Sequence, residues 1–396
     1  MFNIIQGFVF MTVLSGCTAH TVKKAPVTFR IATFNVSMEA GNYMLGDQVP
    51  SGLELFQLLA TGEHRQIQNI AEIIQRTRPD VILLNEFDYT TDDAKGVKAF
   101  IHNYLAVSQQ GAVPIDYPHY YTGPVNTGVS SGVDLNHDGK VTDSGGDAFG
   151  YGLYPGQYGM VLLSRYPIDK SQVRTFQHFL WQDMPNGLMG TVKDPQGLDW
   201  YSNEAKGVLR LSSKSHWDVP MLVEGKIIHI LASHPTPPVF DGPENRNGKR
   251  NHDEIRFWVD YISGKDSSAY IYDDKGVRGG LKDEAFVILG DLNASPEEGD
   301  AHKEAIQALI RHPRVNNSFM PLSNGGKQHS PNNVHGASHT AFWRMRADYV
   351  LPAKKAGEVL ASGVFWPRRD DALQRLIENR QASSDHRLVW VDIKVP

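Results

Sequence analysis

The stretch that most constrains the fold is residues 285–296, with the sequence AFVILGDLNASP. Its apolar run, residues 286–289, has the length of a buried β-strand. Asp291 and Asn293 follow at alternate positions, and alternate residues of an extended chain point to the same side. We therefore expect a strand that presents a carboxylate and an amide together at the rim of a sheet. In isolation the segment is better explained as a strand that runs into an Asx turn, and only the other motifs favour a functional site.

The composition is that of a soluble globular enzyme. The chain has 396 residues, of which 41% are hydrophobic and 21% are charged, and a chain of this length buries a large core. The formal net charge of -5 provides no basic field of the kind that tight, nonspecific binding to duplex nucleic acid requires. This charge does not exclude an enzyme that reaches phosphates through metal ions.

The N-terminal segment carries the only cysteine, Cys17, so no intramolecular disulfide can form. Residues 2–14 are mostly apolar but too few to span a bilayer, and Leu-Ser-Gly-Cys follows at residues 14–17. This pattern resembles the lipobox of bacterial lipoproteins, in which the cysteine receives a diacylglyceryl group. The resemblance implies a signal peptide over residues 1–16, a tether over residues 17–27 and an exported protein that is lipid-anchored through Cys17.

Two details of this segment affect the interpretation. The usual Lys or Arg near the start of a signal peptide is missing, and a buried N-terminal strand with an incidental cysteine is the alternative. Thr18 follows the cysteine, where Asp is the usual signal for retention in the inner membrane. The outer membrane is therefore the expected location if the cell has one.

The folded part begins with a strand–helix–strand pattern. Residues 29–36 alternate between apolar and polar, which predicts a strand with Asn35 near its end. Residues 63–79 have apolar side chains at helical spacing and end at a proline. Residues 80–84 form a second apolar strand, which ends at Asn85 and Glu86. Such a pattern is typical of a crossover unit between parallel strands.

Six motifs in order resemble the endonuclease/exonuclease/phosphatase superfamily, the DNase I-like proteins. They are Thr33-Phe34-Asn35, PDVILLNEFD, GMVLLSRYP, GDLNASP, RADYVLP and SSDHRLV. The resemblance implies an α/β fold, a four-layer α/β/β/α sandwich of two mixed sheets packed face to face with outer helices, over residues 28–396. Two positions depart from the family pattern: Asn85 replaces the more frequent Gln, and Ala347 replaces Ile or Val.

The resemblance also implies the site residues and their chemistry. Glu86 and Asp385 are hard oxygen ligands suited to Mg²⁺, Mn²⁺ or Ca²⁺, and Asn35 would add an amide oxygen or hold a metal-bound water. The expected catalytic residues are His234, Asp291, Asn293, Asp348 and His386.

Each catalytic residue has an expected role. His386 would activate water as the base, because imidazole titrates near neutral pH, and Asp348 would pair with it. His234 would donate to the phosphate or assist the leaving group. Asp291 would orient the nucleophile or protonate the leaving oxygen, with Asn293 holding it in place.

An insertion over residues 111–156 is rich in Gly, Asp, Asn and Tyr, which predicts a long loop. Within it, Asp134, Asn136 and Asp138 match the first half of an EF-hand calcium loop. Gly145 occupies the twelfth position, where an EF-hand has Glu, so Asp143 or Asp147 would have to complete the site. A structural Ca²⁺ site and an acidic, solvated turn remain alternative interpretations.

Two further segments carry possible substrate contacts. Lys214, His216 and Trp217 lie in a polar stretch, although a packed Trp and a solvated Lys are the commoner explanation. The segment after His234, residues 235–251, is expected to form a long loop beside the site, followed by a helix over residues 253–262. This loop carries Arg246, Arg250 and His252. Arginine suits phosphate geometry, and ordinary solvated arginines are the alternative.

The sequence thus predicts an exported, metal-dependent phosphoesterase that hydrolyses phosphodiester or phosphomonoester bonds, acts as a monomer and is anchored to a bacterial membrane. One alternative is an extracellular nuclease that degrades DNA or RNA, because nucleases are frequent in the family. Another is a surface binding protein that uses the same fold without catalysis, against which the complete set of acid, base and metal positions argues.

Overall fold

The computed structural model describes residue 2 and residues 27–395 except 45 and 47. Two sheets form its centre. The first has the strand order β10-β11-β1-β2-β4-β3 and comprises β1 (Val27–Met38), β2 (Val81–Phe87), β3 (His119–Thr122), β4 (Met160–Ser164), β10 (Glu358–Val364) and β11 (Val389–Val395). The second has the order β5-β6-β7-β8-β9 and comprises β5 (Arg174–Thr175), β6 (His216–Val223), β7 (Lys226–Ser233), β8 (Ala285–Asp291) and β9 (Asp348–Pro352).

Both sheets are mixed. β1 runs parallel to β2 and antiparallel to β11, while β7 runs parallel to β8 and β8 antiparallel to β9. β1 and β2 of the first sheet pack against β8 of the second, so the sheets face each other. The apolar runs 81–84 and 286–289 are fully buried between the layers, as expected of strands covered on both faces.

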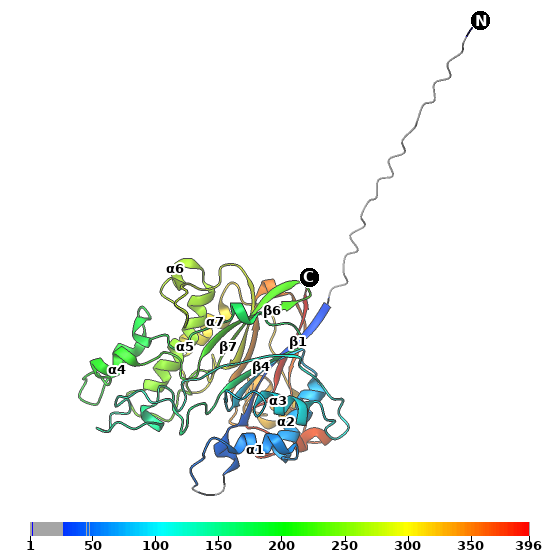
Figure 1. Cartoon of the computed structure of the whole chain (residues 1–396), viewed down its shortest axis with the longest axis horizontal. Coiled ribbons are helices and arrows are strands. Elements are labelled where there is room, and N and C mark those ends of the chain that lie inside the picture. The colour runs from blue at the N-terminus through cyan, green and yellow to red at the C-terminus, as the bar shows by residue number, and fades with distance from the viewer. Residues whose placement is uncertain (1, 3–26, 45, 47, 396) are drawn as a thin grey trace.

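Helices cover the outer faces of the two sheets. Figure 1 shows α1, α2 and α3 on one side of the strands and α5, α6 and α7 on the other. The α-helices are α1 (Glu54–Thr61), α2 (Arg65–Thr77), α3 (Val97–Phe100), α4 (Asn203–Val208), α5 (Arg246–Ile262), α6 (Lys265–Ser268), α7 (Lys303–Arg311) and α8 (Asn324–His329). The predicted four-layer α/β/β/α sandwich is confirmed.

Short helical turns complete the secondary structure. The segment Ile101–Leu105 is a π-helix, and the 3₁₀ turns are Ala40–Tyr43, Gly145–Asp147, Lys170–Gln172, Trp181–Asp183, Leu188–Thr191, Gly336–Ser338, Lys354–Ala356 and Ala372–Leu376. Among the described residues, no helix is both long enough and apolar enough to cross a membrane. Cys17 lies outside the described residues, as does nearly all of the predicted signal peptide and tether.

The strand–helix–strand prediction is confirmed as β1, α2 and β2, whereas two local predictions differ from the structure and one helix was not predicted. The segment 246–252, predicted as loop, forms the first two turns of α5. Its residues are nearly all polar, so no apolar periodicity marks the helix there. α1 lies in a stretch for which no element was predicted. β3 lies inside the insertion 111–156 and pairs with β4, so this part of the insertion belongs to the first sheet.

Candidate active site

The predicted site residues meet where the strands of both sheets end. Because the sheets pack face to face, the carboxyl ends of the parallel pairs β1/β2 and β7/β8 lie together. These ends carry Asn35, Glu86, His234 and Asp291. Asp348 at the start of β9 lies directly across from Asp291 in the ladder, and Asp385 and His386 precede β11.

Asp348 and His386 form a buried hydrogen-bonded pair. Nδ1 of His386 lies 2.9 Å from Oδ2 and 3.2 Å from Oδ1 of Asp348. Thr340 Oγ1 accepts the backbone N–H of Asp348, and Ser384 Oγ accepts that of His386. These contacts fix both the side chain and the backbone of His386. The structure thus brings the two predicted residues together, and their joint role in catalysis remains a prediction.

Asp291 is the centre of the cluster. Its Oδ2 lies 3.4 Å from Nε2 of His234, 3.5 Å from Nε2 of His386 and 3.1 Å from Nδ2 of Asn35. Its Oδ1 accepts the backbone N–H of Asn293 at 2.9 Å. Four donors therefore converge on one carboxylate that is almost completely buried, which is the arrangement that favours the ionised form.

The electrostatics of these groups follow from this geometry. Burial opposes ionisation of Asp291, but His386, His234 and the Asn35 hydrogen bond outweigh it and hold the pKa well below its usual range. Burial would lower the pKa of His386, yet Asp348 and Asp291 outweigh burial and raise it to about 10. Without a cation, His386 is therefore protonated at neutral pH. It can act as the predicted base only when nearby negative charge is neutralised.

The pKa of His234 is shifted in the opposite direction to that of His386. Burial and the positive charge of Lys214 lower its pKa to about 4, against the influence of Asp291. Its ring is therefore neutral at physiological pH. Nδ1 of His234 is buried and has no hydrogen-bond partner within the described part of the chain. With the proton on Nε2 beside Asp291, Nδ1 is an acceptor without a partner, which costs free energy.

The carboxylates of the site fit a divalent cation. The ligand atoms of Asp291, Asp348 and His386 lie within 4.8 Å of one another and form the group among the described residues that could hold a metal ion. Burial raises the pKa of Glu86 to about 7, against His386 and a hydrogen bond from Asn35, while Asp385 and Asp291 add to the rise. Several carboxylates thus lie close together in a buried site, an arrangement that a divalent cation would stabilise.

The predicted metal set differs from this group. The charges of Glu86 and Asp385 interact with that of His386. Neither residue belongs to the group of Asp291, Asp348 and His386, whose ligand atoms lie close together. The amide oxygen of Asn35 accepts the backbone N–H of Ser37, and its nitrogen donates to Asp291. In this state Asn35 orients Asp291, and its role at a metal remains a prediction.

Backbone conformation turns the strand ends toward the site. Ser37, Glu86 and Asn293 have φ values of 49°, 55° and 52°, which are uncommon for residues other than glycine. They follow or interrupt β1, β2 and β8 at the rim. Gly290, with φ of 149°, is required because a Cβ there would lie 2.0 Å from the backbone oxygen of Ser233. This close approach brings Asp291 beside His234.

Asn293 supports the site through its backbone. Its N–H holds Asp291, as described above, whereas its side-chain amide donates to the carbonyl of Pro235 at 3.2 Å. The expectation that Asn293 holds Asp291 in place is therefore met by the main chain, and the side chain instead fixes the segment that follows His234.

The arginines after His234 have structural contacts. Arg250 donates to the backbone carbonyls of Phe149, Arg210 and Leu211, so its guanidinium ties the insertion to the segment between α4 and β6 rather than facing a substrate. Arg246 pairs with Glu244 at 3.2 Å. Because both arginines lie in α5, the prediction that they belong to a loop beside the site is wrong.

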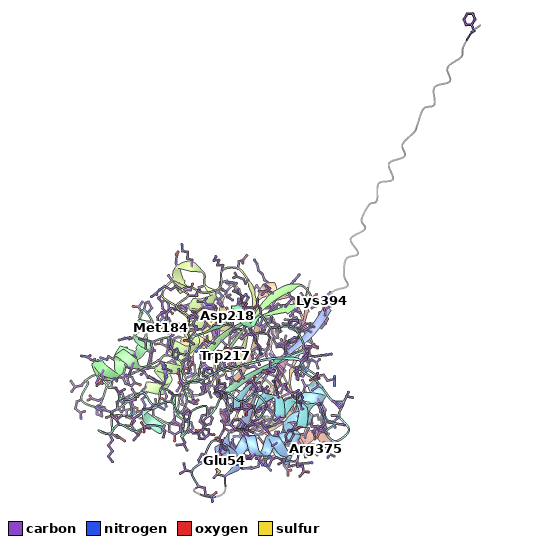
Figure 2. The ribbon with its side chains drawn as sticks, in the orientation of Figure 1. Glu54, Met184, Trp217, Asp218, Arg375 and Lys394 are labelled. Carbon is purple, nitrogen blue, oxygen red and sulfur yellow. The ribbon has the colours of Figure 1, made fainter. Side chains whose placement is uncertain are left out.

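The stretch before β6 contributes to the site in one respect. Trp217 is fully buried in the interior, as expected (Figure 2). Lys214 is only 5% exposed, so the expectation of a solvated lysine is wrong, and its charge acts on His234. His216 is also buried, with Nε2 2.9 Å from the carbonyl oxygen of Glu254.

The predicted calcium loop is built from local hydrogen bonds. Asp134 and Asp147 each accept several backbone N–H groups of the loop, and Asp143 lies on the exposed surface near Ser130. Asp134, Asp138, Asp143 and Asp147 do not form a close group of potential ligands within the described residues. Calcium binding by this loop, with Asn136, remains a prediction.

Several contributors to the site were missed from the sequence. Ser37 donates to Asp385 at 3.2 Å, and its position two residues after Asn35 on one strand was the available signal. The side chain of Trp343, 46% exposed, contacts the ring of His386 edge-on, with 4.7 Å between the two ring centroids. No local pattern in the sequence indicates that this aromatic side chain lies at the site.

Comparison with known proteins places this geometry in a family. The Endonuclease/Exonuclease/phosphatase family model matches residues 32–386, and no curated protein matches the sequence. Similar solved structures include an endonuclease/exonuclease/phosphatase from Beutenbergia cavernae DSM 12333, with 19% identity, a TM-score of 0.49 and coverage of 93% of this chain and 72% of that chain.

Two further similar structures have lower identity. Sphingomyelinase C from Streptomyces griseocarneus has 14% identity, a TM-score of 0.42 and coverage of 93% of this chain and 100% of that chain. The human Nocturnin catalytic domain has 14% identity, a TM-score of 0.44 and coverage of 92% and 93%. Members of the matched family are generally hydrolases of phosphoester bonds. The match over most of the chain, together with the fold and the clustered motifs, shows that the protein belongs to the endonuclease/exonuclease/phosphatase family.

Proposed function

We propose that the protein is an exported, lipid-anchored phosphoesterase that hydrolyses phosphodiester or phosphomonoester bonds and depends on a divalent cation. One observation carries this proposal: the Nε2 atoms of His234 and His386 lie 3.4 and 3.5 Å from the same oxygen of Asp291. Asp348 is hydrogen-bonded to the other ring nitrogen of His386. Carboxylate and imidazole groups that accept and donate protons therefore lie together at the rim of the sheets.

The acidic side chains would hold the cation. Glu86 and Asp385 offer hard oxygen ligands next to the group of Asp291, Asp348 and His386. A bound Mg²⁺, Mn²⁺ or Ca²⁺ would supply positive charge that favours attack on an anionic phosphoester. The family's hydrolytic chemistry and this donor set support the proposal together.

The protein side chains have separate roles in the reaction. Ionised Asp291 orients the attacking water by accepting its hydrogen bond. The His386–Asp348 pair exchanges the proton, and the Asp348 contact stabilises the charged imidazole. Neutral His234, with Nε2 beside Asp291, would donate its Nε2–H to an oxygen of the phosphoester. When nearby negative charge is neutralised, unprotonated His386 would take a proton from the attacking water as the water oxygen bonds to phosphorus. The ester P–O bond then breaks, and the leaving oxygen takes up a proton from solvent.

A substrate screen of the purified protein tests the proposal. The panel comprises bis-p-nitrophenyl phosphate, p-nitrophenyl phosphate, sphingomyelin, plasmid DNA and RNA, each with Mg²⁺, Mn²⁺, Ca²⁺ or EDTA. We expect cation-dependent hydrolysis of at least one phosphoester. A folded protein that hydrolyses none of them with any cation would favour the binding protein without catalysis, and cleavage of DNA or RNA alone would favour the nuclease.

Export and anchoring are tested in cells. Because Cys17 follows Leu-Ser-Gly, we expect palmitate labelling and recovery in the membrane fraction, both lost in Cys17→Ala. An unlabelled wild-type protein found wholly in the cytosol would contradict this part of the proposal.

A further inference from the structure

A cavity of about 260 Å³ opens beside the active site, at the start of α2. Two cationic side chains line it, those of Arg65 and Arg380, together with Ser37, Asn42, Tyr43 and His64, and burial lowers the pKa of His64. We call it the cationic pocket. None of these side chains belongs to the proposed catalytic group.

The cationic pocket shares a wall with the active site. Ser37 Oγ donates to Oδ1 of Asp385 at 3.2 Å, and Nε of Arg380 lies 3.7 Å from Oδ2 of the same carboxylate. Asp385 precedes His386 directly. A ligand in the cationic pocket therefore lies next to the point where the phosphoester would react.

The positive charge of the pocket is largely unneutralised. In the part of the chain that the structure describes, no hydrogen bond or ion pair satisfies the guanidinium of Arg65. The contact of Arg380 with Asp385, at 3.7 Å, is longer than a charge-assisted hydrogen bond. Nδ1 of His64 is buried without a hydrogen-bond partner among the described residues. Two exposed guanidinium groups without a close acceptor, those of Arg65 and Arg380, thus line one cavity.

The main chain adds to the positive electrostatic potential of the cationic pocket. α2 begins at Arg65, and its N-cap residue, His64, makes no side-chain hydrogen bond to the first turn. The first N–H groups of a helix lack intrahelical partners and carry a partial positive charge. In this pocket the helix end reinforces the charged side chains, which favours an anion.

We propose that the cationic pocket binds a second phosphate group of the substrate while the phosphoester to be cleaved sits at Asp291 and His386. This inference rests on the proposed function and narrows it. The preferred substrates would be phosphoesters that carry another phosphate close to the scissile bond, because Asp385, which contacts Ser37 and Arg380 of the pocket, directly precedes His386.

Matched dinucleotides test the inference. TpT has one phosphodiester, and pTpT and TpTp add one phosphate on either side. In the wild type with Mg²⁺, we expect kcat/KM for at least one phosphorylated dinucleotide to exceed that of TpT by about tenfold or more, the effect of one charge-assisted contact. In Arg65→Gln this ratio should fall toward one. Equal kcat/KM for all three substrates in the wild type would overturn the inference.

Arg311→Gln is the matched control. Arg311 is an exposed arginine at the end of α7, far in sequence from the pocket, and this variant should keep the wild-type ratio. If Arg65→Gln also kept it, the pocket would not be the site of the second phosphate. If inorganic phosphate instead inhibited TpT cleavage in an Arg65-dependent way, without any preference for phosphorylated substrates, the pocket would bind a free anion and the inference would be wrong.

A binding measurement separates this inference from the proposed function. If no phosphoester is hydrolysed with any cation, the proposed function fails, and calorimetric titration of pTpT and TpTp against TpT then examines the pocket alone. Tighter binding of a phosphorylated dinucleotide that is lost in folded Arg65→Gln would support the cationic pocket. Equal binding by the wild type and Arg65→Gln would overturn it.

Discussion

Nδ1 of His386 lies 2.9 Å from Oδ2 of Asp348, and the opposite nitrogen of the ring faces Asp291 at 3.5 Å. One imidazole therefore bridges two buried carboxylates. The Asp348 contact holds the ring in one orientation and favours its charged form. The other nitrogen remains directed at the carboxylate on which His234 also converges.

Replacement of His386 should remove most of the activity. His386→Ala should lower turnover of any accepted phosphoester by about 100- to 10,000-fold, the usual cost of losing a general acid or base. Steady-state kinetics and circular dichroism check rate and fold. His178→Ala, which removes an exposed histidine, is the matched control and should behave like the wild type. Near-wild-type turnover by a folded His386→Ala protein would refute the assignment.

Asp348→Asn should lower turnover, but by less than His386→Ala does. Because Asp348 raises the pKa of His386, the amide should lower that pKa and move the acid limb of the pH–rate profile to lower pH. The double variant Asp348→Asn/His386→Ala should be little slower than His386→Ala, since residues that act as a unit are not additive. Fully multiplicative losses in kcat would show that the two residues act independently.

Glu86→Gln should weaken the response to the cation. The substitution removes one hard oxygen ligand, so a Mg²⁺ titration of activity should show a higher concentration for half-maximal rate and a lower maximum. Glu63→Gln, at an exposed position, should leave the titration curve unchanged. An unaltered Mg²⁺ dependence in Glu86→Gln would exclude Glu86 as a ligand.

The metal-free protein should lose stability as pH rises. The pKa of His386 is raised to about 10 in the folded state, against about 6.5 in an unfolded chain. The folded state therefore binds this proton more tightly, so the stabilisation is fully present below pH ~6.5 and is lost as pH rises toward about 10. Urea unfolding in EDTA should show this decline for the wild type and a smaller one for His386→Gln. Identical slopes in both proteins would contradict the shift.

The loop around Asp134 should bind Ca²⁺ if its resemblance to an EF-hand has functional meaning. In that case, chelation should lower the Tm of the wild type in Mg²⁺-containing buffer, and Asp134→Ala should erase the shift. A melting curve that is independent of Ca²⁺ would leave the solvated turn as the interpretation.

The sequence by itself determined several individual elements, and its resemblance to the endonuclease/exonuclease/phosphatase superfamily implied the four layers and the site residues. Apolar runs marked β2 and β8, helical spacing marked α2, and alternation placed Asp291 at the end of its strand. These are local properties of the chain, so nearby residues suffice to reveal them. The polar start of α5 and the short strand β3 had no such signal and were missed.

The tertiary structure decided how these residues work together. Asp348 and His386 are 38 positions apart, and Asn35 and Asp291 are 256 apart, so only sheet packing brings each pair into contact. The cationic pocket likewise joins Arg65 of α2 to Arg380 of a distant loop. The pKa values of His386, His234 and Asp291 depend on burial and on neighbouring charges. Both arise only when the two sheets close over the site, because local sequence fixes neither the solvent exposure nor the long-range distances that set an electrostatic interaction.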